Sequence, residues 1–166
     1  QKLREIRKRR DSYFSNRPHP WFNCPDKLLR ALDANWSYFE GTAIHLDIVA
    51  CPSRCSWRRM PSDAKGDMVE KCRNHLASTL SRLENGTWLI LDGATVRAAV
   101  FAAATNHKPL LERELQLGNT TIRIASGQLF HADRKEFRYF GWDGNLHSLT
   151  PASIDGIVHA WREMVR

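Results

Sequence analysis

Apolar residues recur along this chain at two spacings, which predict a mixture of helices and strands. Spacings of three and four residues predict an amphipathic helix with a basic outer face over 2–14, a short helix over 25–32 and an Ala-rich helix over 94–104. A long helix is expected from its N-cap at Ser62 or Asp63 to Asn85-Gly86, where the glycine ends it. A last helix is expected to begin at Thr150 as N-cap with Pro151 as its first residue. Strict alternation or short apolar runs predict strands over 42–51, 88–91, 120–125 and 137–142, while 111–117 fits either a helical turn or a strand.

The order of these elements predicts the fold class. The apolar run Trp88–Leu91 is flanked by helical patterns, which is typical of a strand in a parallel sheet covered on both faces. The expected architecture is α/β, with three layers (α/β/α) around a short, mainly parallel central sheet. With 166 residues, we expect one domain over 1–166 that carries residues 1–17 as a basic N-terminal helix. Cys72, Trp88 and Trp161 are expected in its core.

Charge changes this picture mainly at the N-terminus. The net charge is +7, and residues 1–17 hold seven basic and two acidic side chains, which leaves +2 for the rest of the chain. This basic arm, which includes Arg9 and Arg10, is suited to contacts with phosphates of DNA, either duplex or single-stranded. A solvated helix face explains the same charges equally well.

Ligands of open parallel sheets bind beyond the carboxyl ends of the strands. We therefore expect segments 51–60, 92–95 and 126–131 to converge at one edge. That edge would carry an arginine and aromatic set suited to base stacking and phosphate contact: Arg54, Trp57, Arg58, Arg59, Asp92, Gln128, Phe130 and His131. Such loops are polar in most α/β domains, and Asp92 has the alternative role of capping the helix that follows.

Other chemistry is sparse. The sequence has no dinucleotide, phosphate-loop, zinc-protease or nucleophile-elbow motif, and the spacing of its four cysteines does not favour a metal site, so no cofactor and no metal are expected. His45 and Asp47 lie on the mixed face of the strand expected over 42–51, as an acid or base or, alternatively, as buried groups bonded to the backbone. No apolar run reaches the ~20 residues of a membrane span, and a cytoplasmic location is expected.

Three segments together resemble the uracil-DNA glycosylase superfamily. They are Gly41–Val49 followed by a loop that contains Trp57, Cys72-Arg73-Asn74-His75-Leu76 on a helix, and Trp88–Thr95 leading into the Ala-rich helix. The segment Gly141–Ser148 is similar to one in bacterial relatives of that superfamily, so that the resemblance covers roughly residues 20–165. The resemblance implies a DNA-binding protein that hydrolyses the bond between deoxyribose and a base extruded from the duplex.

The sequence departs from the superfamily where catalysis would occur. The strand-end motif Gly-x-Asp-Pro or Gly-x-Asn-Pro is missing, so the usual first strand is either absent or upstream of Gln1, and Ser126–His131 stands in place of the His-Pro-Ser motif. By the resemblance, His131 and Ser126 are the available substitutes for the missing motif. The catalytic candidates are His131 and, from its place on the mixed face of the strand expected over 42–51, Asp47. Leu129 or Phe130 becomes the wedge that replaces the flipped base. The iron–sulfur cluster of some relatives is not expected, although Cys51 and Cys72 match two of its ligand positions.

Three function classes follow from these observations. The first is a DNA-binding glycosylase-like protein, which is a hydrolase if it is active. The second is an interaction or scaffold module that keeps the fold without the catalytic motifs. The third is an enzyme that acts on a small molecule at the same sheet edge. The sequence does not identify a protein partner, the substrate base or the oligomeric state.

Overall fold

The computed structural model describes residues 20–47, 59–117, 120–144 and 150–165, which divide into two compact units. Unit 1 is Gln1–Leu46 with Leu146–Arg166, and unit 2 is Asp47–Asn145. The basic helix predicted over 2–14 lies outside the described residues.

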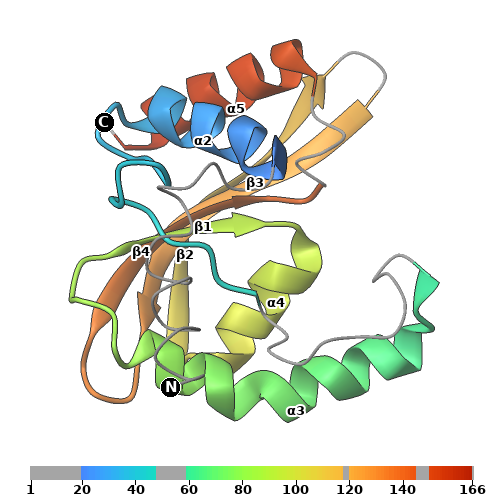
Figure 1. Cartoon of the computed structure of the whole chain (residues 1–166), viewed down its shortest axis with the longest axis vertical. Coiled ribbons are helices and arrows are strands. Elements are labelled where there is room, and N and C mark those ends of the chain that lie inside the picture. The colour runs from blue at the N-terminus through green and yellow to red at the C-terminus, as the bar shows by residue number, and fades with distance from the viewer. Residues whose placement is uncertain (1–19, 48–58, 118–119, 145–149, 166) are drawn as a thin grey trace, which may run out of the picture. The chain divides into compact units, whose positions relative to one another are not determined.

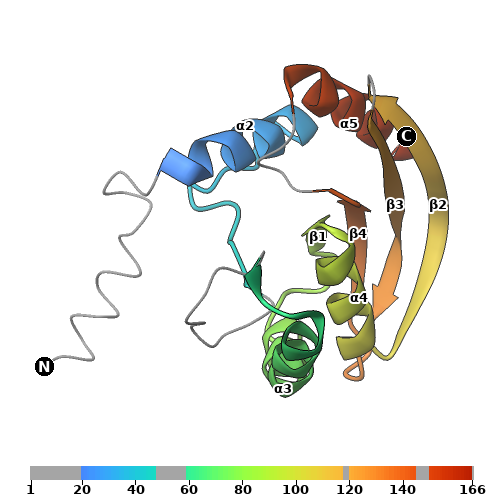
Figure 2. The same cartoon turned by 90° about the vertical axis from the view of Figure 1, so that its right-hand side faces the viewer.

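Unit 1 contains a short 3-10 turn, η2 (Pro20–Phe22), followed by two α-helices, α2 (Asn23–Leu32) and α5 (Pro151–Met164). These two helices lie side by side (Figures 1 and 2). The predicted start of α5 is confirmed, because the Thr150 hydroxyl accepts a hydrogen bond from the Ser153 backbone N–H at 3.2 Å and Pro151 opens the helix. Trp161 is buried as expected and meets Trp36 edge to face at 5.4 Å.

The strand predicted over 42–51 is wrong for its described part, because residues 43–47 belong to no strand. Ile44 is 63% exposed and Leu46 is 42% exposed, so the alternating apolar positions are not in a core. The backbone N–H groups of Thr42 and Ala43 donate instead to the carbonyl of Ser37 in a local turn, each at 3.0 Å. An alternating pattern makes a strand only where a neighbouring strand accepts its hydrogen bonds. Residues 48–51 lie outside the described residues.

Unit 2 is a four-stranded sheet with two helices. Its elements are α3 (Ser62–Leu80), β1 (Trp88–Asp92), α4 (Ala94–Ala103), β2 (Asn106–Leu117), β3 (Thr120–Phe130) and β4 (Glu136–Trp142). The segment 111–117 is therefore a strand. Pro61 occupies the N-cap of α3, so neither Ser62 nor Asp63 caps it, and Gly93 rather than Asp92 precedes α4.

The sheet is mixed, which corrects the expectation of a mainly parallel one. The strand order is β1-β4-β3-β2; only β1 and β4 run parallel, while β2–β3 and β3–β4 are antiparallel. Connection length explains the difference. The loop between β2 and β3 has two residues, and the loop between β3 and β4 has five. Two consecutive strands that run parallel must be joined by a crossover of about a dozen residues or more, so these loops are long enough only for antiparallel pairing.

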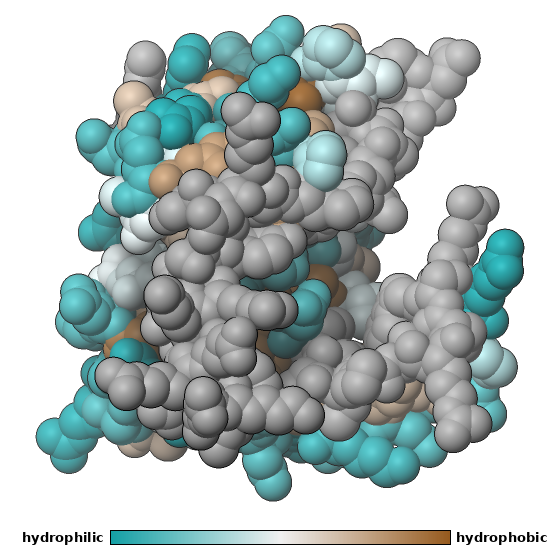
Figure 3. Space-filling model, viewed as in Figure 1, coloured by the Kyte–Doolittle hydropathy of each residue, from teal (hydrophilic) through white to brown (hydrophobic). Residues whose placement is uncertain are grey.

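Helices α3 and α4 cover one face of this sheet (Figure 2). The core between them is apolar and includes these side chains: Leu76, Leu80, Leu89, Leu91, Val100, Leu129, Phe137 and Tyr139. Cys72 is buried on the inner side of α3, as predicted. About half of the residues of α3 are exposed, and the coloured atoms visible along the lower part of Figure 3, where this helix lies, are mainly hydrophilic.

Strand β3 runs five residues beyond its predicted end at Ala125, straight through Ser126-Gly127. Gly127 lies opposite Tyr139, and a Cβ on Gly127 would stand 2.8 Å from the hydroxyl oxygen of that ring. Glycine is therefore needed here for the close approach of an aromatic ring rather than for a turn.

Candidate functional site

The alternation of side chains along β3 divides the predicted binding segment 126–131 between two faces of the sheet. Ser126, Gln128 and Phe130 lie on one face, while Leu129 and His131 lie on the face covered by α3 and α4. Leu129 is fully buried in the core, so its predicted role as a wedge in DNA is wrong. Ser126 is also buried, whereas Gln128 and Phe130 are half-buried.

The predicted convergence of 92–95 with 126–131 is also wrong. Asp92 ends β1 opposite Trp142, whereas Phe130 ends β3 opposite Glu136, at the other end of β4. These two positions on β4 are six residues apart, which corresponds to about 20 Å along a strand. The error follows from the direction of β3, because the carboxyl end of an antiparallel strand lies at the opposite end of the sheet from the carboxyl ends of its neighbours.

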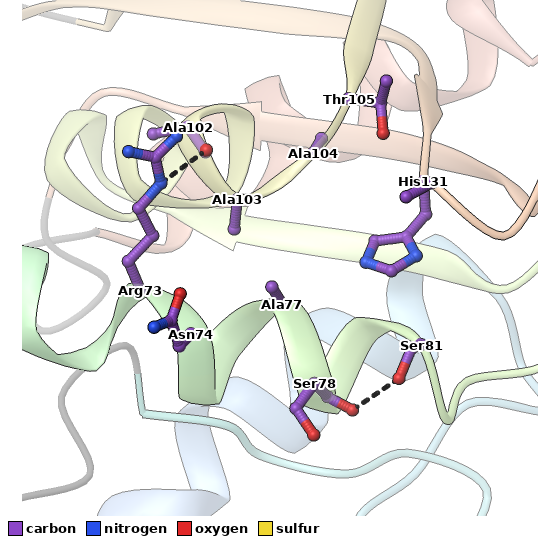
Figure 4. Close-up of a pocket in the computed structure, with 11 residues that line it drawn as sticks. Arg73, Asn74, Ala77, Ser78, Ser81, Ala102, Ala103, Ala104, Thr105 and His131 are labelled. Carbon is purple, nitrogen blue, oxygen red and sulfur yellow. Dashed lines mark hydrogen bonds between the residues drawn. The ribbon is translucent and has the colours of Figure 1, made fainter.

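His131 lies instead at a hollow between the end of β3 and two helices. The cavity has a volume of about 450 Å³, within the range of small-molecule sites, and Figure 4 shows the imidazole on one side with α3 on the other. Its lining comes from α3, the end of α4 and the turn after β3: Arg73, Asn74, Ala77, Ser78, Ser81, Ala102, Ala103, Ala104, Thr105, His131 and Ala132. Asp47, the second predicted catalytic residue, does not line it.

An imidazole–carboxylate pair gives this cavity its chemistry. His131 Nδ1 lies 2.8 Å from Asp133 Oδ1, and the His131 side chain is only 11% exposed. The hydrogen bond from His131 lowers the pKa of Asp133, against a smaller opposing effect of burial. An ionised carboxylate only accepts, so Nδ1–H is the donor and the other nitrogen, Nε2, carries the lone pair when the ring is neutral.

The turn that carries this pair is fastened to α3. The His131 backbone N–H donates to the Lys135 carbonyl at 2.9 Å, and Arg134 takes the left-handed conformation that closes a three-residue hairpin loop, with φ of 65°. The Lys135 ammonium donates to the carbonyl of Ser81, the C-cap of α3, and to the carbonyl of Leu83 at 2.8 Å. The loop is therefore held at the C-terminal end of α3, and His131 with it.

The opposite wall of the cavity is mostly small and polar. Arg73 Nε donates to the carbonyl of Ala102 at 3.0 Å, which ties α3 to α4, and the Arg73 side chain is half exposed at the cavity. Ser81 Oγ donates to the carbonyl of Ser78 at 2.9 Å. An alanine-lined floor with one cation at its side has room for a flat or compact polar ligand.

Sequence reasoning did not predict most residues of this site, among them Arg73, Ser78 and Asp133. Asp133 had a usable signal, since an acidic residue two positions after a histidine in a hairpin turn can reach its imidazole. Arg73 and Ser78 had none, because only the packing of α3 against α4 places them beside His131.

None of the remaining predicted residues that the structure describes lines this cavity. Arg9, Arg10, Arg54, Trp57 and Arg58 lie outside the described residues, and Arg59 is exposed but does not line the cavity. His45 packs edge to face against Phe22 at 5.7 Å in unit 1. Trp88 is half-buried rather than in the core.

The described part of the chain has no group of three or more histidine, cysteine or acidic residues arranged to hold a metal ion. Its helices are each too short or too polar to cross a membrane.

No protein-family model, no curated protein and no solved structure matches this chain. The resemblance to uracil-DNA glycosylases therefore stays a prediction.

Proposed function

We propose that this chain is a DNA-binding protein with a three-layer, uracil-DNA glycosylase-like architecture, and that His131 is the general base that hydrolyses the N-glycosidic bond of an extruded base. The observation that supports a hydrolytic role is the His131–Asp133 pair beside a cavity of about 450 Å³. The support for DNA as the partner is the distribution of charge and the resemblance of the sequence.

In this mechanism, Asp133 holds the imidazole through Nδ1–H and leaves Nε2 to take a proton from water. The water oxygen then bonds to the C1′ carbon of deoxyribose, the bond from C1′ to the base nitrogen breaks, and the base leaves with the electron pair. Lys135 has a positioning role, because its contacts to Ser81 and Leu83 fix the turn that carries the pair. Arg73 is placed to contact a phosphate or a base carbonyl at the cavity.

The test is release of free base from DNA that contains uracil or another modified base. We expect His131→Ala to lower the rate by about 10²–10⁴-fold, as removal of a general base does. Asp133→Asn should lower it less, because the asparagine still accepts from Nδ1–H but no longer stabilises the imidazolium. His159→Ala is the matched control, since His159 is an exposed histidine in unit 1. Full base release by the His131→Ala protein would refute the proposed base.

A second candidate is an interaction module without catalysis, and one observation favours it. Alanines form much of the cavity wall, and among the residues that line it only Arg73 and His131 have ionisable side chains. Binding of oligonucleotides with no base release from any modified-base DNA would favour the module. Absence of oligonucleotide binding even at low ionic strength would exclude DNA as the partner for both candidates.

A further inference from the structure

One row of side chains crosses the whole sheet on the face opposite α3 and α4. Trp88 on β1 lies opposite Arg138 on β4, Arg138 lies opposite Gln128 on β3, and Gln128 lies opposite Lys108 on β2. Residues directly opposite each other in neighbouring strands share a face, so these four belong to one row, about 14 Å long.

The row combines an aromatic ring, an amide and two cations. Arg138 and Lys108 are exposed, and Trp88 and Gln128 are half-buried. The guanidinium carbon of Arg138 lies 5.7 Å from the centre of the Trp88 ring. Phe130 adds a second half-buried aromatic side chain two residues beyond Gln128 on the same face.

The charge of this face is positive where the row is exposed. The acidic residue next to it, Glu136, accepts a hydrogen bond from Gln128 Nε2 at 2.7 Å and lies opposite Phe130. Its carboxylate is thus directed to the amide, while the two cations of the row form no ion pair within the described residues that would neutralise them. A polyanion with exposed flat rings complements such a surface.

We infer that this face binds single-stranded DNA across the row Trp88–Arg138–Gln128–Lys108. Bases stack on the Trp88 and Phe130 rings or on the Arg138 guanidinium plane, and Arg138 and Lys108 contact phosphates. A duplex keeps its bases stacked inside and offers no ring faces, so the single strand is the form that fits. The inference rests on the DNA partner of the proposed function but not on His131, which lies on the other face of the sheet.

The experiment is fluorescence anisotropy of a labelled oligothymidylate with the full chain over a series of salt concentrations. Lys108→Gln and Arg138→Gln should each weaken binding about threefold to tenfold and reduce the slope of log Kobs against log salt by about 0.7. Trp88→Leu should weaken binding by about tenfold with the salt slope unchanged, because stacking releases no counterion.

Lys71→Gln and Arg123→Gln are the matched controls, since Lys71 is exposed on α3 and Arg123 is exposed on β3 away from the row. Circular dichroism and melting curves of every variant check that it remains folded. Equal affinity of the row variants and the controls would overturn the inference, and so would tighter binding of a duplex than of the single strand. A chain that binds no oligonucleotide overturns it together with the proposed function. Loss of affinity in the row variants without any base release supports it and refutes the proposed catalysis alone.

Discussion

Asp26 is a buried carboxylate that accepts three hydrogen bonds, and its replacement tests how unit 1 is held together. Oδ1 accepts from the Ser37 hydroxyl at 2.9 Å and from the Tyr38 backbone N–H at 2.7 Å, and Oδ2 accepts from Arg30 Nε at 2.9 Å. The residue is only 4% exposed, so water cannot replace these donors. Asp26 therefore joins α2 to the loop that follows it.

The expected loss of unfolding free energy depends on which hydrogen bonds each Asp26 variant keeps. Asp26→Asn keeps an acceptor for Ser37 and Tyr38, but it replaces two charge-assisted hydrogen bonds by neutral ones and turns an amide toward Arg30; we expect a loss of about 1.5 kcal/mol. Asp26→Ala removes all three bonds and leaves the buried N–H of Tyr38 without an acceptor, for a loss of about 3 kcal/mol. The ion pair with Arg30 adds little, because solvent screens that side chain, which is 39% exposed.

The dependence on pH separates charge from packing. Burial opposes ionisation of Asp26, but the hydrogen bonds from Arg30, Ser37 and Tyr38 outweigh it, so the pKa in the folded state is lowered. A lowered pKa contributes stability that is complete above the unfolded value of about 3.9 and is lost as pH falls through the folded value. The free energies of unfolding of the native chain and Asp26→Asn, measured in urea by tryptophan fluorescence, should therefore converge on acidification.

Two results would refute this reasoning. One is an Asp26→Asn protein as stable as the native chain at neutral pH. The other is a difference between the two proteins that stays constant on acidification, because a lost packing contact does not titrate.

Two further predictions concern backbone positions in unit 2. Gly127→Ala should lower the free energy of unfolding by about 3 kcal/mol or more, because its Cβ would clash with the Lys108 carbonyl and the Tyr139 ring. Gly66→Ala, on the open side of α3, should raise the free energy of unfolding by about 1 kcal/mol, because alanine favours a helix more than glycine does. Urea melts in which both variants change stability in the same direction would contradict this prediction. Arg134→Gly should raise the melting temperature by a few degrees, about 0.5–1 kcal/mol, because glycine adopts a φ of 65° without strain; a calorimetric scan showing a lower melting temperature would contradict it.

Local patterns predicted the helices well because their signals are local. Thr150 with Pro151 marks the start of α5, and the apolar spacing around Cys72 marks the inner face of α3. The strands were predicted less well because a strand is completed by its neighbour. Ile44 and Leu46 alternate as in a strand, yet residues 43–47 pair with no strand in the described part of the chain. Gly127 is typical of a strand end in the sequence, but in the structure it lies within β3, where the Tyr139 ring packs closely against it.

The candidate site shows the same limit at the level of strand direction. Because residues 126–130 continue β3, their side chains alternate between the two faces of the sheet. Because β3 runs antiparallel to β4, the segment ends at the end of the sheet opposite to Asp92. One predicted segment thus supplies two surfaces. His131 belongs to the cavity under α3 and α4, while Gln128 belongs to the row on the other face. Because β3 joins the two surfaces through its backbone but the sheet separates them, variants on one face can report on binding without touching the imidazole on the other. A chain whose DNA binding depends on Lys108 and Arg138, and whose base release depends on His131, would show that both surfaces serve one substrate.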